Sequence, residues 1–143
     1  MPAQANRTLL ISGMVLVLLG LIVGLLIPAF TNPRLGLSAH LVGLQAGLLL
    51  MVLALAWPIA RLSRRTELTA QRLLLYSAYA IWISTVLGGI FGTSRATPIA
   101  GEGYSGSAWQ EILVSAGLGT GSLAVLVAVS LLVVGFTRTG ETS

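Results

Sequence analysis

The chain contains one histidine, His40, which is the strongest metal ligand in its sequence. Gly43 and Gly47 follow it within an uncharged run. In a helix, seven residues return a side chain to within roughly 20° of its starting direction, so His40 and Gly47 share a face. Because glycine has no Cβ, a flat group can approach the backbone beside the imidazole. The spacing suits an imidazole that ligates haem iron while the macrocycle packs on Gly43 and Gly47.

Composition determines the elements that must position this histidine. Hydrophobic residues make up 55% of the chain and charged residues 8%. The apolar residues form four uncharged runs, each long enough to cross a hydrocarbon core of about 30 Å at 1.5 Å per residue. We therefore expect an all-α, integral membrane four-helix bundle that forms a single domain over residues 1–143. The expected helices cover residues 9–30, 37–60, 71–91 and 111–136.

Arginine, which supplies all eight basic residues, predicts the orientation of the helices. Six arginines fall on the side shared by the N-terminus, the second loop and the C-terminal tail, against Arg34 and Arg95 on the other side. The positive-inside rule then places both termini in the cytoplasm, which implies a multi-pass protein of a bacterial-type inner membrane, with His40 near the outer end of its helix. Anionic membrane lipid accounts for the net positive charge, and nothing in the sequence indicates nucleic acid as a partner.

Two interpretations of a lone histidine in a membrane helix remain open. It is either a functional residue or a hydrogen-bonding bridge between helices. As a haem ligand, His40 would leave the far face of the iron open as a Lewis acid for a substrate oxygen. A bis-histidine electron carrier would need a second ligand, and the chain has no other histidine.

Polar aromatic side chains in the third run are candidates for a pocket wall. Tyr79 and Trp82 share a helical face, and Ser84 follows them. Polar tips at this depth face protein or a cavity because each hydroxyl or indole N–H needs a partner, although simple packing with satisfied tips explains any one of them. We expect Trp82 and Ser84 to line a substrate chamber.

The segment TSRATPIAGEGYSGSAWQE is the only long stretch outside the apolar runs. It lies on the same side of the membrane as His40 and presents Glu102 and Tyr104. A lid over the histidine and a solvated connector are equally compatible with its composition. Tyr79, Tyr104 and Glu102 are the candidate proton donors for catalysis.

Several other chemistries are excluded by the residue types present. No acidic residue lies inside the four uncharged runs, the last of which covers residues 112–136, and this argues against a small proton-coupled exporter. The chain has no cysteine, and therefore no thiolate nucleophile or cysteine-ligated metal cluster. It also has no His/Glu set with metal-ligand spacing and no phosphate-binding glycine loop after a strand.

Three stretches carry a resemblance to known proteins: NPRLGLSAHLVGLQAG, the segment around YAIW, and TPIAGEGYSG. Together they resemble the small integral-membrane hydroxylaminobenzene mutases, from about Asn32 to the end of the last run. A more distant likeness is to styrene oxide isomerase, a four-helix membrane enzyme that binds haem b. Ala39-His40, Gly47 and Pro58 match its pattern of Ala-His, a glycine seven residues later and a proline eighteen residues later.

The first resemblance implies an isomerase that converts an aryl hydroxylamine, a small aromatic substrate, to the ortho-aminophenol. The second implies haem b with His40 as its proximal ligand, and a homo-oligomer, specifically a trimer. The chain departs from the isomerase pattern at Ala46, where that family has asparagine, and at a helix-three tyrosine that is glycine here. These departures put epoxide opening in that enzyme's manner in question, whereas a haem site is compatible with them. The alternative function is a non-catalytic four-helix module whose histidine bridges helices or holds haem for electron transfer.

Overall fold

Four long helices make up the computed structural model, which describes residues 5–138. Short 3₁₀ turns, Ile27–Ala29 and Trp57–Ile59, follow the first two helices. No strand occurs among the described residues, and the all-α prediction is confirmed. The helices are α1 (Arg7–Leu26), α2 (Pro33–Ala56), α3 (Arg64–Phe91) and α4 (Ala108–Thr137).

All four helices begin earlier than the apolar runs predicted, α2 and α3 by the most, because polar residues cap them. The side chain of Asn32 accepts hydrogen bonds from the backbone N–H groups of Arg34 and Leu35, so α2 starts at Pro33 rather than at residue 37. The Ser63 hydroxyl accepts from the Thr66 N–H, and α3 therefore starts seven residues before the predicted residue 71. Hydrophobicity marks the part of a helix that lies in lipid, whereas caps mark where it begins.

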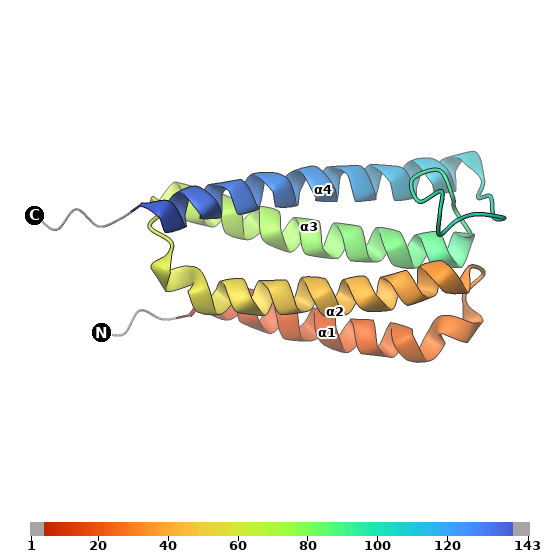
Figure 1. Cartoon of the computed structure of the whole chain (residues 1–143), viewed down its shortest axis with the longest axis horizontal. Coiled ribbons are helices and arrows are strands. Elements are labelled where there is room, and N and C mark those ends of the chain that lie inside the picture. The colour runs from red at the N-terminus through yellow and green to blue at the C-terminus, as the bar shows by residue number, and fades with distance from the viewer. Residues whose placement is uncertain (1–4, 139–143) are drawn as a thin grey trace, which may run out of the picture.

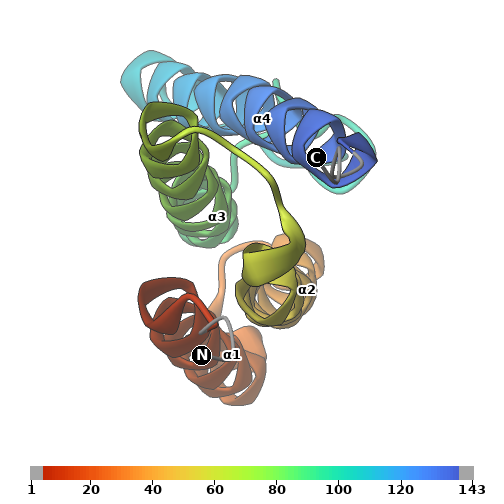
Figure 2. The same ribbon diagram turned by 90° about the vertical axis from the view of Figure 1, so that its left-hand side faces the viewer.

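The helices form two antiparallel hairpins, α1–α2 and α3–α4, joined mainly by contacts between α2 and α3 (Figure 1). Seen along the helices, α4 lies against α3, on the side away from α1 and α2 (Figure 2). The described chain begins and ends at the same end of the molecule. Between the hairpins, a core of buried leucine and alanine side chains includes Leu50, Leu74 and Leu132.

Glycines bring α1 and α2 into close contact. A Cβ added at Gly13 would lie 2.6 Å from the carbonyl oxygen of Gly47, and one added at Gly43 would lie 2.7 Å from the Cα of Gly20. Neither distance leaves space for a side chain. This is the small-residue packing that membrane helices use when the surrounding lipid provides no hydrophobic driving force between them.

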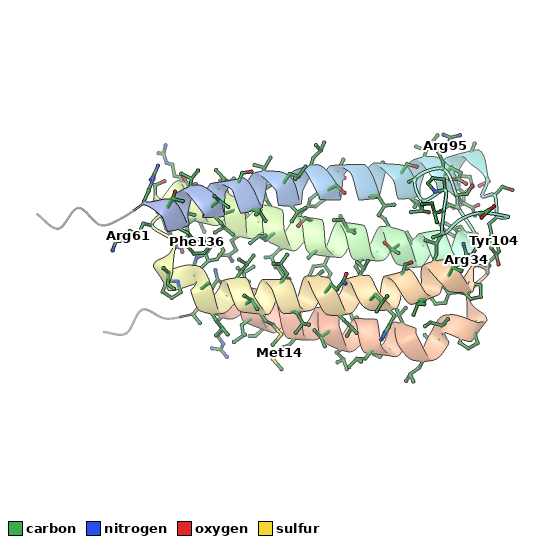
Figure 3. The ribbon with its side chains drawn as sticks, viewed as in Figure 1. Met14, Arg34, Arg61, Arg95, Tyr104 and Phe136 are labelled. Carbon is green, nitrogen blue, oxygen red and sulfur yellow. The ribbon has the colours of Figure 1, made fainter. Side chains whose placement is uncertain are left out.

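All four helices are long and apolar enough to cross a membrane. Many large apolar side chains point outward, among them Met14, which is 58% exposed, and Leu25, which is 83% exposed. Such side chains are stable when they contact other apolar atoms instead of water, and the hydrocarbon core of a bilayer provides those contacts. The chain is therefore a multi-pass membrane protein. Arg61 lies at the end that holds the described termini, while Arg34 and Arg95 lie at the opposite end (Figure 3).

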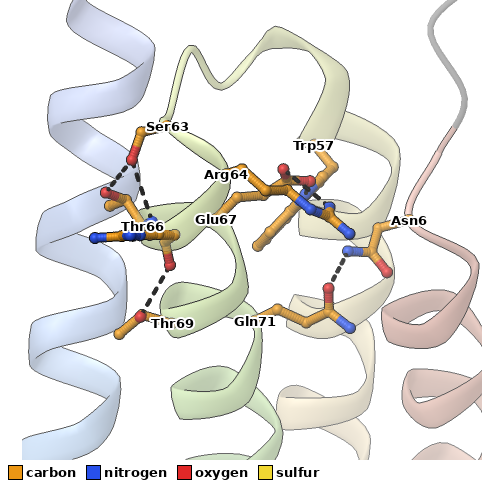
Figure 4. A network of polar contacts seen from close by, with 9 residues as sticks. Asn6, Trp57, Ser63, Arg64, Thr66, Glu67, Thr69 and Gln71 are labelled. Carbon is orange, nitrogen blue, oxygen red and sulfur yellow. Dashed lines mark hydrogen bonds and ion pairs between the residues drawn. The ribbon is translucent and has the colours of Figure 1, made fainter.

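A polar network ties the helices together at the Arg61 end (Figure 4). The Asn6 amide donates to Gln71 over 3.0 Å and so links the start of α1 to α3. The Trp57 indole N–H donates to the Glu67 carboxylate over 2.8 Å, and Arg64 pairs with the same carboxylate at 3.3 Å. These bonds hold the connection between α2 and α3, far from His40.

Candidate functional site

The imidazole of His40 packs against α1. Its Nδ1 lies 2.8 Å from the carbonyl oxygen of Gly20. A carbonyl can only accept, so Nδ1 carries the proton, and Nε2 is left with a free lone pair. Gly24 makes this position possible, because a Cβ there would lie 2.6 Å from Nδ1. His40 therefore bridges two helices through one ring nitrogen and keeps the other available as a ligand.

This geometry fits a haem ligand. A metal-binding histidine usually donates its second ring N–H to a carbonyl or carboxylate, which fixes the tautomer and raises the basicity of the ligating nitrogen. The Gly20 carbonyl has that position here. The ring is half-buried, and Nε2 takes no hydrogen bond from a described residue. The described residues contain no group of three or more His, Cys, Asp or Glu side chains that could hold a metal ion.

The expected glycine-floored groove beside His40 is not open. Gly43 faces Gly20 of α1, and Gly47 faces Gly13 and Val17, with a Cβ at Gly47 only 2.6 Å from the Gly13 carbonyl oxygen. The groove was predicted from the face of α2 in isolation, whereas in the folded chain α1 packs against both glycines. Gly43 and Gly47 are therefore helix-contact residues in this structure, and they do not present a surface on which a macrocycle could lie.

Trp82 of α3 contacts α2 at Gly43, one helical turn beyond His40. Its indole Nε1 would be 2.9 Å from a Cβ at Gly43. The indole N–H is buried and has no hydrogen-bond partner. A buried donor without a partner costs free energy, about 1–3 kcal/mol, unless a ligand or water pairs with it. Trp82 thus provides an unused hydrogen-bond donor beside Gly43 of α2.

Ser84 lies on the opposite side of α3 from Trp82. Its side chain is buried against α4, where a Cβ at Gly117 would overlap the hydroxyl oxygen. The two residues are two positions apart, about 200° around the helix, so one points to α2 and the other to α4. The structure does not bring Trp82 and Ser84 into a single chamber as the sequence analysis expected.

Tyr79 is far from His40 along the helices. Its hydroxyl donates to the carbonyl oxygen of Ser12 over 3.1 Å. Ser12 precedes Gly20, the partner of His40, by eight residues, which is about 12 Å along α1. The phenolic proton already serves a contact between α1 and α3. Tyr79 therefore bridges helices and does not meet the imidazole.

The segment between α3 and α4 is anchored at both of its ends. Gly92 ends α3 in the left-handed conformation, with φ of 67°, which a residue with a side chain rarely adopts. Glu111, in the first turn of α4 and only 6% exposed, accepts backbone N–H bonds from Ser94, Arg95 and Gly106 at 3.0, 2.9 and 3.1 Å. One carboxylate thereby closes the loop onto the helix.

The tip of the same loop is bound to the start of α2. The Asn32 amide donates to the Ala100 carbonyl over 2.8 Å, and the Arg34 side chain donates to the Glu102 carbonyl. The Arg34 guanidinium also lies 5.7 Å from the centre of the Tyr104 ring, close enough for a cation–π contact. Tyr104 is half-buried, and Glu102 is exposed. The α3–α4 loop is thus tethered to the start of α2, at the end of the bundle opposite the described termini.

Sequence reasoning missed the parts that Gly20, Gly24, Asn32 and Glu111 play. Gly20 and Gly24 have the four-residue spacing of small residues that allows close helix packing, and Gly20 does pack on Gly43. The acceptor for His40, however, is a backbone carbonyl, which no side-chain pattern reveals. Asn-Pro before an apolar run was a usable cap signal for Asn32. Glu111 had a weaker one, an acidic residue in the first turn of a helix.

Comparison with known proteins identifies the family. The sequence model of the styrene oxide isomerase family matches residues 5–137. The chain belongs to this family. It is also 42% identical over 130 residues to hydroxylaminobenzene mutase HabB of Ectopseudomonas oleovorans, covering 90% of this chain and 79% of that protein. Hydroxylaminobenzene mutase HabA of the same organism is 38% identical over 105 residues, which cover 73% of this chain and 78% of HabA.

Both resemblances noted in the sequence are therefore confirmed, and the chain is an isomerase. No solved structure gives a significant match. The matched region contains α1 to α4 and with them His40, Trp82 and the loop between α3 and α4.

Proposed function

We propose that this membrane isomerase converts an aryl hydroxylamine to the corresponding ortho-aminophenol. In this rearrangement the N–O bond breaks and a C–O bond forms at the adjacent ring carbon, while the ring carbon's proton is lost and the nitrogen ends as an amine. No oxidant or reductant is consumed. The support is the identity of 42% to a protein named hydroxylaminobenzene mutase over 90% of this chain.

We further propose that His40 holds haem b through Nε2. The observation that carries this proposal is the hydrogen bond of 2.8 Å between Nδ1 and the Gly20 carbonyl, which leaves the Nε2 lone pair free to bind a metal. When bound, haem iron would supply Lewis acidity toward the substrate's oxygen. Gly24 contributes by leaving space for the imidazole against α1.

The surrounding residues have separate tasks in this proposal. The unpaired Trp82 N–H donates a hydrogen bond to a polar atom of the substrate and so orients it. The apolar helices around it keep bulk water from attacking the electron-poor ring. Of the proposed proton donors, Tyr79 is engaged with Ser12, and Tyr104 has a hydroxyl that donates to no described residue. Tyr104 is therefore the proton donor we favour, with the exposed Glu102 as the alternative.

The decisive experiment compares purified wild type with His40→Ala and with Tyr79→Phe as a matched control. Visible absorption measures haem, and chromatography measures ortho-aminophenol formed from phenylhydroxylamine. We expect a Soret band and activity in wild type and in the control, and neither in His40→Ala. Activity without a Soret band would remove haem and point to side-chain acid catalysis. A Soret band without ortho-aminophenol would favour an electron carrier or another substrate.

A further inference from the structure

A groove on the outer side of the α3–α4 hairpin lies apart from the histidine site. Its volume is about 360 Å³, and its walls are mostly alanine, leucine and isoleucine side chains. Three hydroxyl-bearing residues, Tyr76, Ser84 and Thr120, also line it. The groove runs between two membrane-length helices, so it opens toward the hydrocarbon part of the bilayer.

Ser84 is the unusual member of this lining. The side chain is only 6% exposed, yet its hydroxyl makes no hydrogen bond to a described residue. Thr85, Thr120 and Ser130 bond back to the carbonyl four residues earlier at 2.8, 2.8 and 2.7 Å, whereas the Ser115 hydroxyl of α4, like that of Ser84, has no partner among the described residues. That local bond is the usual solution for a hydroxyl in a membrane helix. Ser84 therefore has a hydroxyl left unpaired in the groove wall, beside Gly117.

The Tyr76 and Thr120 pair adds a second polar point. Their hydroxyl oxygens are 2.6 Å apart, and Thr120 donates its proton to the Ala116 carbonyl. Tyr76 must then donate to Thr120, which leaves lone pairs on the Tyr76 oxygen as acceptors. Along α3, Tyr76 and Ser84 are eight residues apart, about 12 Å. The groove thus offers the Ser84 hydroxyl as donor and acceptor at one end, and the Tyr76 oxygen as an acceptor toward the other end.

We propose that this groove binds a small aromatic molecule with one hydrogen-bonding nitrogen or oxygen group, which enters from the bilayer and bonds to the Ser84 hydroxyl. An apolar cavity of about 150 Å³ accepts benzene, so a groove of 360 Å³ holds a substituted ring. Leu87 and Leu113 offer the ring an apolar wall. A lipid acyl chain would leave Ser84 unpaired in a medium without water.

The choice of ligand rests on the proposed function, since aryl hydroxylamines and aminophenols belong to this chemical class. The site itself does not overlap the histidine site, because His40 faces α1 whereas Ser84 faces α4. The groove would be a second binding site, which takes substrate or product from the membrane and is separate from the site of the reaction.

Photolabelling of the protein in nanodiscs with 4-azidophenol tests this inference, with the labelled peptides identified by mass spectrometry. We expect labels on α3 and α4 residues that face the groove, and protection by excess phenylhydroxylamine. Ser84→Ala should require about threefold to tenfold more probe, the effect of one lost hydrogen bond. Ala116→Phe, which fills the groove from an outward-facing position, should abolish the labelling.

Leu126→Phe is the matched control, because Leu126 is a 64% exposed position of α4 outside the groove. The inference is overturned if the label spreads evenly over lipid-facing residues, if Ala116→Phe labels like wild type, or if groove peptides are occupied by a second copy of the chain. Labelling needs no turnover. Groove labelling without ortho-aminophenol formation would refute the proposed reaction alone, and activity without groove labelling would refute the groove alone.

Discussion

Replacing Glu111 with glutamine should release the loop between α3 and α4 while the helices stay folded. The Glu111 carboxylate uses Oε1 for the N–H groups of Ser94 and Gly106 and Oε2 for that of Arg95. Glutamine keeps one acceptor oxygen, but its amide nitrogen replaces the other. The Arg95 N–H then faces a second donor, so one charge-assisted hydrogen bond is lost in a site that is only 6% exposed.

The expected cost is about 1.5–3 kcal/mol, the usual contribution of a hydrogen bond to a charged group. Because the three bonds close only the loop, this free energy should appear as local opening. Trypsin measures the opening, since Arg95 is the single trypsin site between α3 and α4. When opening is fast relative to cleavage, the cleavage rate after Arg95 should rise about tenfold to a hundredfold.

Glu102→Gln is the control for this experiment. It also removes one carboxylate charge, here from the loop itself, but the Glu102 side chain is exposed, and it is the Glu102 backbone carbonyl that accepts from Arg34. Cleavage of this variant should match wild type within about twofold, as surface substitutions change stability little. Equal cleavage rates for Glu111→Gln and wild type would refute the anchoring role of the carboxylate.

Three further predictions follow from the helix contacts and the arginine distribution. Gly24→Val places atoms where the His40 imidazole lies, so bound haem, measured as Soret absorbance per protein, should fall below about a tenth of wild type, a loss of roughly 1.4 kcal/mol or more in binding free energy. Gly119→Val, at a glycine with open space around it, should leave bound haem unchanged. Equal loss of haem in both variants would contradict the assignment of His40 as the ligand. Tyr79→Phe loses the bond to Ser12 and should lower the free energy of unfolding by about 0.5–1.5 kcal/mol with kcat retained, whereas a large fall in kcat would restore Tyr79 as a proton donor. A fluorescent protein fused after the C-terminus should fluoresce in bacterial cells and alkaline phosphatase fused there should stay inactive; the reverse pattern would invert the predicted orientation.

The sequence alone determined the class of the protein. Four uncharged runs of membrane length are a one-dimensional property, because a bilayer forces each span to satisfy its own backbone hydrogen bonds as a helix. The number of helices and their membrane-spanning type followed directly from these runs, and the resemblance to a known family predicted that the chain is an isomerase. Helix starts were less accurate, since the caps at Asn32 and Ser63 are polar residues outside the apolar runs.

Only the tertiary structure decided what each site residue faces. The glycines after His40 lie on one helical face as predicted, but α1 occupies that face, and a pattern within one helix carries no information about which neighbour packs there. Trp82 and Ser84 are near in sequence and separated by the helical twist, so α2 receives one and α4 the other. The carbonyl that orients His40 comes from the backbone of α1, and backbone groups leave no mark in a sequence.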